Sequence, residues 1–96
     1  MRERNVVVAI VRDGAGQFLL AYNRHWDGFS FPMTVLQEGA NPTGELARAA
    51  LARDLRAAHL HATADQFATV HLVGESARTG EQTLYHFTLF EVRPAV

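Results

Sequence analysis

The sequence contains no cysteine, and this absence excludes two classes of structure. Without thiol groups the chain can form neither disulfide bonds nor thiolate metal sites, and it fits a reducing compartment. Long apolar runs are scarce as well, since the run near the N-terminus covers only residues 6–11 and ends at Arg12 and Asp13. That run is too short for a signal peptide and far too short for a membrane span. We therefore predict a cytoplasmic protein that does not contact membranes.

An excess of charge of either sign is also missing. Ten acidic and nine basic residues give a formal net charge of −1, and the two signs are interspersed. Domains that bind nucleic acid usually carry a clustered excess of basic residues, so we expect no nucleic-acid partner. The 96 residues, of which 48% are apolar, suffice for one domain (residues 1–96) with one modest core.

Apolar patterning before residue 33 predicts three strands. Residues 5–12 are rich in β-branched side chains and unbroken in their apolarity, which is typical of a strand buried on both faces. Residues 13–16 (Asp-Gly-Ala-Gly) can form the turn of a hairpin, with residues 17–23 as its second strand. A short alternating strand at residues 29–31 ends at Pro32, which cannot donate a hydrogen bond to a neighbouring strand.

The rest of the chain contains one sustained helical pattern. It begins either at Asn41 and Pro42, or after Thr43, and runs to about Ala58. The segments that follow are predicted, in order, as a connector, a strand, a loop and a strand: residues 60–65, 66–73, 74–82 and 83–93. Together these elements predict an α+β domain with a mixed sheet.

The most informative spacing in the sequence lies in and before this helix. Gly39 is followed after five residues by Glu45, and Glu45 after seven by residues 53–55 (Arg-Asp-Leu). This spacing resembles the Nudix box of the Nudix hydrolase superfamily, and the order of the predicted elements also resembles the family order. The resemblance implies a Nudix-like mixed sheet packed with one main helix, as in a shortened α/β/α sandwich. The family's glutamate pair falls here on Ala57 and Ala58.

A second register of the box is also compatible with the sequence. It keeps Phe31 and Pro32 in phase with the family's Phe-Pro pair and places Arg48 and Ala49 on the family's Arg-Glu pair. The first register places Arg53 and Asp54 there instead, and it continues in phase beyond them. Both registers leave the glutamate pair absent.

The resemblance implies an enzyme that cleaves nucleoside diphosphate derivatives with Mg²⁺ or Mn²⁺ held by glutamates. Hard cations need several oxygen ligands, and alanine supplies none. We therefore expect a domain that has lost most of its hydrolytic activity, and that binds a nucleoside-diphosphate-type ligand or assembles with a protein partner. We expect no cofactor; if any metal binds, the residual Nudix-box residues Asp54 and Glu45 are its candidate ligands. The alanine-rich helix face predicts close packing against a sheet or a second copy.

Two other functions stay open at this point. One is a divergent metal-dependent pyrophosphohydrolase that uses Glu45, Asp54 and Glu38. The other is a small α+β oligomerisation domain unrelated to Nudix chemistry. A short domain with open sheet edges also favours a homodimer.

Several further residues have two interpretations. Arg53 either orients the box through Glu45 or lies on the surface beside another acid. Trp26 either stacks on a ligand ring or anchors its loop, and Gly39, a candidate ligand-binding position of the box, serves a turn. We interpret the five histidines as surface or strand residues, of which His71 and His86 could face each other on neighbouring strands.

Overall fold

The computed structural model describes residues 2–24, 27–57, 60–76 and 79–94. The helix and strands follow one another in this order: β1 (Arg2–Ile10), β2 (Ala21–Asn23), β3 (Gly28–Ser30), β4 (Met33–Val35), α1 (Gly44–Leu55), β5 (Ala62–Glu75) and β6 (Gln82–Pro94). Four strands form one sheet in the order β4-β1-β6-β5, while β2 and β3 form a separate two-stranded sheet. Because β1 and β6 run parallel and the other neighbours antiparallel, the predicted α+β class with a mixed sheet is confirmed.

The strand β1 lies inside the sheet and is buried on both faces where it is most apolar. Its residues from Val6 to Ile10 are each at most 6% exposed. Val7 and Ala9 pack on the side of α1, whereas Val6, Val8 and Ile10 pack on the other side. The expectation drawn from the unbroken apolar run is confirmed.

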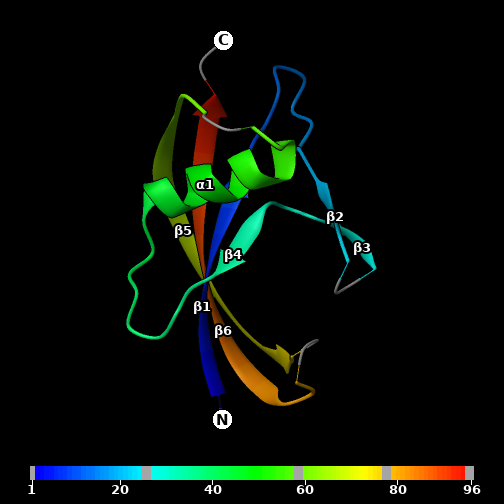
Figure 1. Ribbon diagram of the computed structural model, residues 1–96, viewed down its shortest axis with the longest axis vertical. Coiled ribbons are helices and arrows are strands. Elements are labelled where there is room, and N and C mark those ends of the chain that lie inside the picture. Colours follow the sequence, from blue (N-terminus) through cyan, green and yellow to red (C-terminus); the bar gives the residue numbers. More distant parts are fainter. Residues whose placement is uncertain (1, 25–26, 58–59, 77–78, 95–96) are drawn as a thin grey trace.

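The helix α1 crosses one face of the sheet near the C-terminal end of β6 (Figure 1). We call this the helix face; its core is a cluster from α1, β1, β6 and the loop before α1: Val7, Ala9, Leu36, Ala47, Leu51, Phe90 and Val92. The opposite face, which we call the open face, carries partly buried side chains around a second cluster: Phe31, Met33, Tyr85, Phe87 and Leu89. The side chains of β6 therefore alternate between the two faces, and the strand predicted at residues 83–93 is confirmed.

The bounds of α1 correct part of the prediction. Thr43 is the N-cap, and its Oγ1 accepts a hydrogen bond from the Leu46 amide at 3.3 Å, so the second of the two predicted starts is confirmed. The predicted extension to Ala58 is wrong, because the helix ends at Leu55. Arg56 adopts a left-handed conformation (φ 55°), and the Ala57 amide then bonds back to the Ala52 carbonyl at 2.9 Å.

Three strand predictions also need correction. The connector predicted at residues 60–65 is wrong, since β5 already begins at Ala62, where small side chains fit beneath α1. The turn predicted at residues 13–16 is confirmed, since the Asp13 carbonyl accepts from the Gly16 amide at 3.1 Å, but the two arms of the hairpin pair only close to this turn. The Asp13 amide donates to the Gln17 carbonyl at 2.9 Å, the Leu19 amide donates to the Val11 carbonyl at 3.0 Å, and Arg12 and Phe18 form an isolated bridge. Of residues 17–23, only β2 forms a regular strand, and it pairs with β3.

The chain does not stop its strand pairing at Pro32. The carbonyl of Pro32 accepts a hydrogen bond from the Ala9 amide at 2.8 Å, and β4 follows directly beside β1. Pro32 thus lacks a donor but still contributes an acceptor. Within the described residues, no helix has the length and apolarity needed to cross a membrane.

Candidate functional site

The residues of the box do not converge on one point. Glu45 lies in the first turn of α1 and Asp54 in the last. Nine residues of a regular helix separate two side chains by about 13 Å along the axis and about 180° around it. In the parts of the chain that the structure describes, no group of three or more His, Asp or Glu side chains is arranged to hold a metal ion.

Arg53 fixes the C-terminal end of α1 to the edge of the sheet. Its Nη2 donates to the Met33 carbonyl on β4 at 2.6 Å, and its Nε donates to Asp54 Oδ1 at 3.1 Å. Of the two interpretations of Arg53, the structure shows the surface residue beside an acid, and that acid is Asp54. The arginine therefore couples the helix end to β4.

The small residues of the box helix serve packing. Ala47, Ala50 and Leu51 are at most 2% exposed and face the sheet. The expectation that this face packs closely against a sheet is confirmed. Ala57 follows the helix end, while Ala58 and Trp26 lie outside the described residues.

Gly39 lies in a turn before the helix. Its φ of 84° is in the left-handed region that favours glycine, and the Ala40 amide donates to the Gln37 carbonyl at 3.0 Å. The predicted turn is confirmed, and the role of Gly39 in binding a ligand stays a prediction.

An open groove of about 890 Å³ lies along the open face of the sheet. Its floor consists of Val6, Leu72, Tyr85 and Phe87, which the strand register places on one face. The small β2–β3 sheet lines one side, and Arg53 and Asp54 lie at its border. This volume is in the range of pockets that hold small ligands.

Arginine is the prevailing charged residue of this groove. Four arginines line it (Arg2, Arg4, Arg24 and Arg53), against the two carboxylates Asp54 and Glu75. All nine basic residues of the chain are arginines. The planar guanidinium group can donate two parallel hydrogen bonds to a phosphate or carboxylate. The groove therefore offers sites for an anion despite the chain's net charge of −1.

Two of these arginines are already paired and two are not. Arg53 contacts Asp54, and Arg2 contacts Glu81 at 3.5 Å. Arg4 and Arg24 form no ion pair within the described ranges 2–24, 27–57, 60–76 and 79–94. Arg4 lies beside Tyr85 in the parallel register of β1 and β6, so a free guanidinium and an aromatic ring are neighbours.

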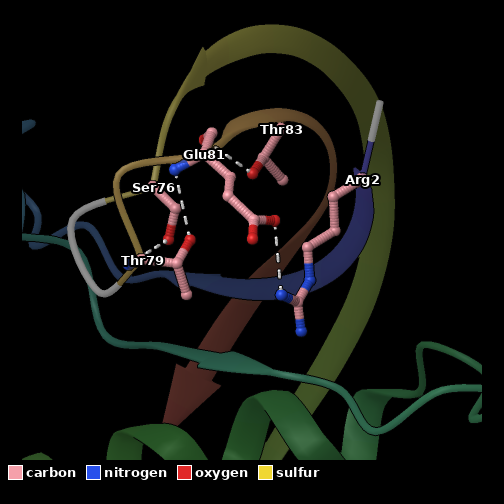
Figure 2. Close-up of polar contacts among 5 residues, drawn as sticks. All are labelled: Arg2, Ser76, Thr79, Glu81 and Thr83. Carbon is pink, nitrogen blue, oxygen red and sulfur yellow. Dashed lines mark hydrogen bonds and ion pairs between the residues drawn. The ribbon is translucent and has the colours of Figure 1, made fainter.

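The turn between β5 and β6 closes one end of the groove. Figure 2 shows the Glu81 carboxylate, on the β6 side of this turn, pointing toward the Arg2 guanidinium at the start of β1. The Thr79 amide donates to Ser76 Oγ at 3.4 Å, and the Thr83 hydroxyl donates to the Glu81 carbonyl at 3.1 Å. These two bonds stabilise the turn itself, while the contact between Arg2 and Glu81 links it to the start of β1.

Aromatic rings line the groove on two sides. The rings of Tyr85 and Phe87 are stacked, with centroids 5.6 Å apart and planes inclined by 25°. Across the groove, the Tyr22 hydroxyl donates to Asp27 Oδ1, and this hydrogen bond raises the pKa of Tyr22 above its ordinary value. The Tyr22 hydroxyl is thus engaged by Asp27, while the residue itself lines the groove.

The groove residues on β1 and β6 are absent from the sites predicted from sequence. The signal that could have found them is the alternation of both strands, which places Arg2, Arg4 and Val6 on one face of β1 and Tyr85 and Phe87 on one face of β6. The parallel pairing that brings these faces together joins residues far apart in sequence. Local patterning alone does not reveal it.

Comparison of the sequence with models of known protein families gives no match, and comparison with curated proteins gives none either. The resemblance to the Nudix box thus rests on residue spacing and element order, and membership of that superfamily stays a prediction.

Proposed function

We propose that this protein is a Nudix-like domain that binds a small anionic ligand of the nucleoside diphosphate type in the open-face groove, and that it does so without efficient hydrolysis. The observation that carries the proposal is the combination of unpaired guanidinium groups and aromatic rings in one groove. Arg4 and Arg24 supply donors for phosphate oxygens, and the Tyr85 ring supplies a surface on which a base can stack.

The absence of efficient hydrolysis follows from the positions of the acids. Cleavage of a diphosphate by this type of chemistry needs a cation held by several oxygen ligands. Asp54 borders the groove, but it also accepts from Arg53. Glu45 lies at the other end of α1. A single carboxylate that already neutralises an arginine is a weak ligand for Mg²⁺.

Calorimetric titration with ADP tests the binding step. We expect Arg4→Gln and Arg24→Gln each to weaken binding about tenfold, which corresponds to about 1.4 kcal/mol for a lost charge-assisted hydrogen bond. Arg48→Gln, on α1 and away from the groove, is the matched control and should leave the affinity unchanged. If ADP does not bind, or if all three variants bind equally well, the groove is not the site.

An assay that follows the formation of nucleoside monophosphate, with Mg²⁺ and with Mn²⁺, tests the second half of the proposal. We expect no turnover above background for nucleoside diphosphate derivatives. Turnover at ordinary enzymatic rates that is abolished by Asp54→Ala would instead establish the divergent pyrophosphohydrolase.

The edge of β5 favours a second candidate function, self-assembly. This strand is 14 residues long and ends the sheet order, and no other strand pairs with its outer edge within the described residues. Val70 and Leu72 are 47% and 56% exposed on it. Two antiparallel β5 edges related by a two-fold axis could extend the sheet across a dimer. Light scattering should then find a dimer that Val70→Lys dissociates; a monomer would exclude this function.

A further inference from the structure

Two histidines face each other on the helix face of the sheet, beyond the part that α1 covers. His71 on β5 is the direct register partner of His86 on β6. Their Nδ1 atoms are 2.7 Å apart, and their rings are inclined by 80°. The lower half of the β5–β6 pair extends past α1 in Figure 1. The two rings therefore lie side by side at a surface that the helix leaves open.

Glu3 determines which nitrogen of His86 carries the proton. The carboxylate Oε1 of Glu3 lies 3.1 Å from Nε2 of His86. A carboxylate accepts hydrogen bonds, so Nε2 of His86 is the N–H that donates to it. The lone pair of neutral His86 is then on Nδ1, and it points at Nδ1 of His71. This is the arrangement of a carboxylate that orients a histidine ligand toward a metal ion.

We propose that His71 and His86 form a binding site for a divalent transition-metal ion such as Zn²⁺, with Glu3 as the positioning residue. Imidazole nitrogens suit Zn²⁺, Cu²⁺ and Ni²⁺, whereas Mg²⁺ prefers oxygen ligands. Two nitrogens each about 2.1 Å from a tetrahedral Zn²⁺ lie about 3.4 Å apart, so the pair has to open by only about 0.7 Å.

The surroundings allow this opening. The side chain of His86 is 27% exposed and that of Glu3 is 64% exposed, and His71 is exposed on the edge strand. Both rings can therefore rotate apart without disturbing the core, and water can fill the remaining coordination positions. When the ion binds, the Nδ1 proton of His71 passes to water and its Nε2 takes up a proton from water, so His71 changes tautomer and both Nδ1 lone pairs become ligands.

This site is independent of the proposed ligand groove. The groove lies on the open face, where Leu72 and Tyr85 point, while the neighbouring His71 and His86 point to the opposite face. Metal binding at the histidine pair and ADP binding in the groove can therefore succeed or fail separately.

Titration with Zn²⁺, followed through the imidazole ¹⁵N resonances, tests the site in the full chain. We expect Zn²⁺ to shift the Nδ1 resonances of both His71 and His86, and the affinity to be measured by competition with a chromophoric chelator. His71→Gln and His86→Gln should each weaken binding roughly tenfold or more, because one of two protein ligands is removed. His61→Gln, at a histidine that precedes β5 and so lies ten residues before His71, should bind as the wild type does.

The role of Glu3 has a readout of its own. In the metal-free protein, Glu3→Ala should shift the His86 ring away from its single tautomer, which the ¹⁵N chemical shifts report, and it should weaken Zn²⁺ binding less than His86→Gln does. The proposal is overturned if Zn²⁺ leaves both rings unshifted. It is equally overturned if His71→Gln and His86→Gln, shown by circular dichroism to be folded, bind Zn²⁺ as tightly as the wild type.

Discussion

The Arg53 guanidinium donates to the Met33 carbonyl at 2.6 Å, and this bond joins the last turn of α1 to the edge strand β4. The helix also packs against the sheet through the buried apolar side chains of Ala47, Ala50 and Leu51. The hydrogen bond to Met33 gives Arg53 a structural role, although Glu45 is too far along α1 to pair with it.

Removal of this link should loosen the helix end. We expect Arg53→Ala to lower the free energy of unfolding by about 1 kcal/mol, which is less than a buried charged hydrogen bond contributes because the side chain is 56% exposed. Arg53→Lys, which can still donate one bond, should lose less. Urea denaturation measures both, and equal stability of Arg53→Ala and the wild type would show that packing alone holds α1.

The left-handed conformation of Arg56 predicts a stabilising substitution. Glycine adopts a φ of 55° without the clash of a side chain, so Arg56→Gly should raise the free energy of unfolding by about 0.5 kcal/mol. The matched control is Arg48→Gly, in the middle of the same helix, which should lower it by about 1 kcal/mol. A loss of stability at Arg56→Gly would contradict the observed helix end. Thermal unfolding followed by circular dichroism distinguishes the two signs.

At Gly44 the structure requires a glycine, so replacing it should destabilise the protein. A Cβ at Gly44 would lie 3.2 Å from both the Cβ and the carbonyl oxygen of Ala64 on β5, and neither is the end of a flexible side chain. Gly44→Ala should therefore push α1 away from the sheet and lower the free energy of unfolding by about 1 kcal/mol. Gly14→Ala is the control, because a Cβ there meets nothing within 4 Å. Similar effects of the two substitutions would exclude close approach as the cause.

Glu91 predicts a loss of stability in acid. The hydrogen bond from Arg93, followed by that from Arg12, lowers the pKa of Glu91 below its ordinary value of 4.5. The unfolded chain therefore binds this proton more readily than the folded chain does. The stabilisation is fully present above pH 4.5 and is lost as the pH falls through the lower folded pKa.

Glu91→Gln tests this dependence. The variant should be less stable than the wild type near neutral pH, and the difference should vanish in strong acid. Urea denaturation across a pH series measures the difference. A constant gap between wild type and variant at every pH would show that the ion pairs with Arg12 and Arg93 do not contribute.

Local patterning predicts the elements whose burial follows from the order of apolar and polar residues in a short stretch of sequence. The apolar run at Val6–Ile10 and the alternation of β6 are of this kind. Local patterning does not predict the start of β5, because Ala62 belongs to the strand through its pairing with Pro94 and its packing beneath α1. Local patterning does not predict the end of α1 either, since Arg56 occupies the left-handed position at which such caps usually have glycine.

The histidine pair could be predicted from the sequence, whereas the groove could not. That His71 and His86 could face each other was predicted, since two neighbouring antiparallel strands bring such pairs together, and the structure confirms it. The groove needs the parallel pairing of β1 with β6, which sets Arg4 beside Tyr85. No short-range signal specifies that register.

The same parallel pairing has a consequence for how the chain reaches its native state. The first strand and the last strand are neighbours at the centre of the sheet, with Arg2 opposite Thr83. The contacts between these strands thus join residues that are far apart in sequence, and such a topology folds slowly. During synthesis, the edge of β1 that pairs with β6 therefore stays uncovered until β6 has been made, and an uncovered apolar strand edge favours aggregation.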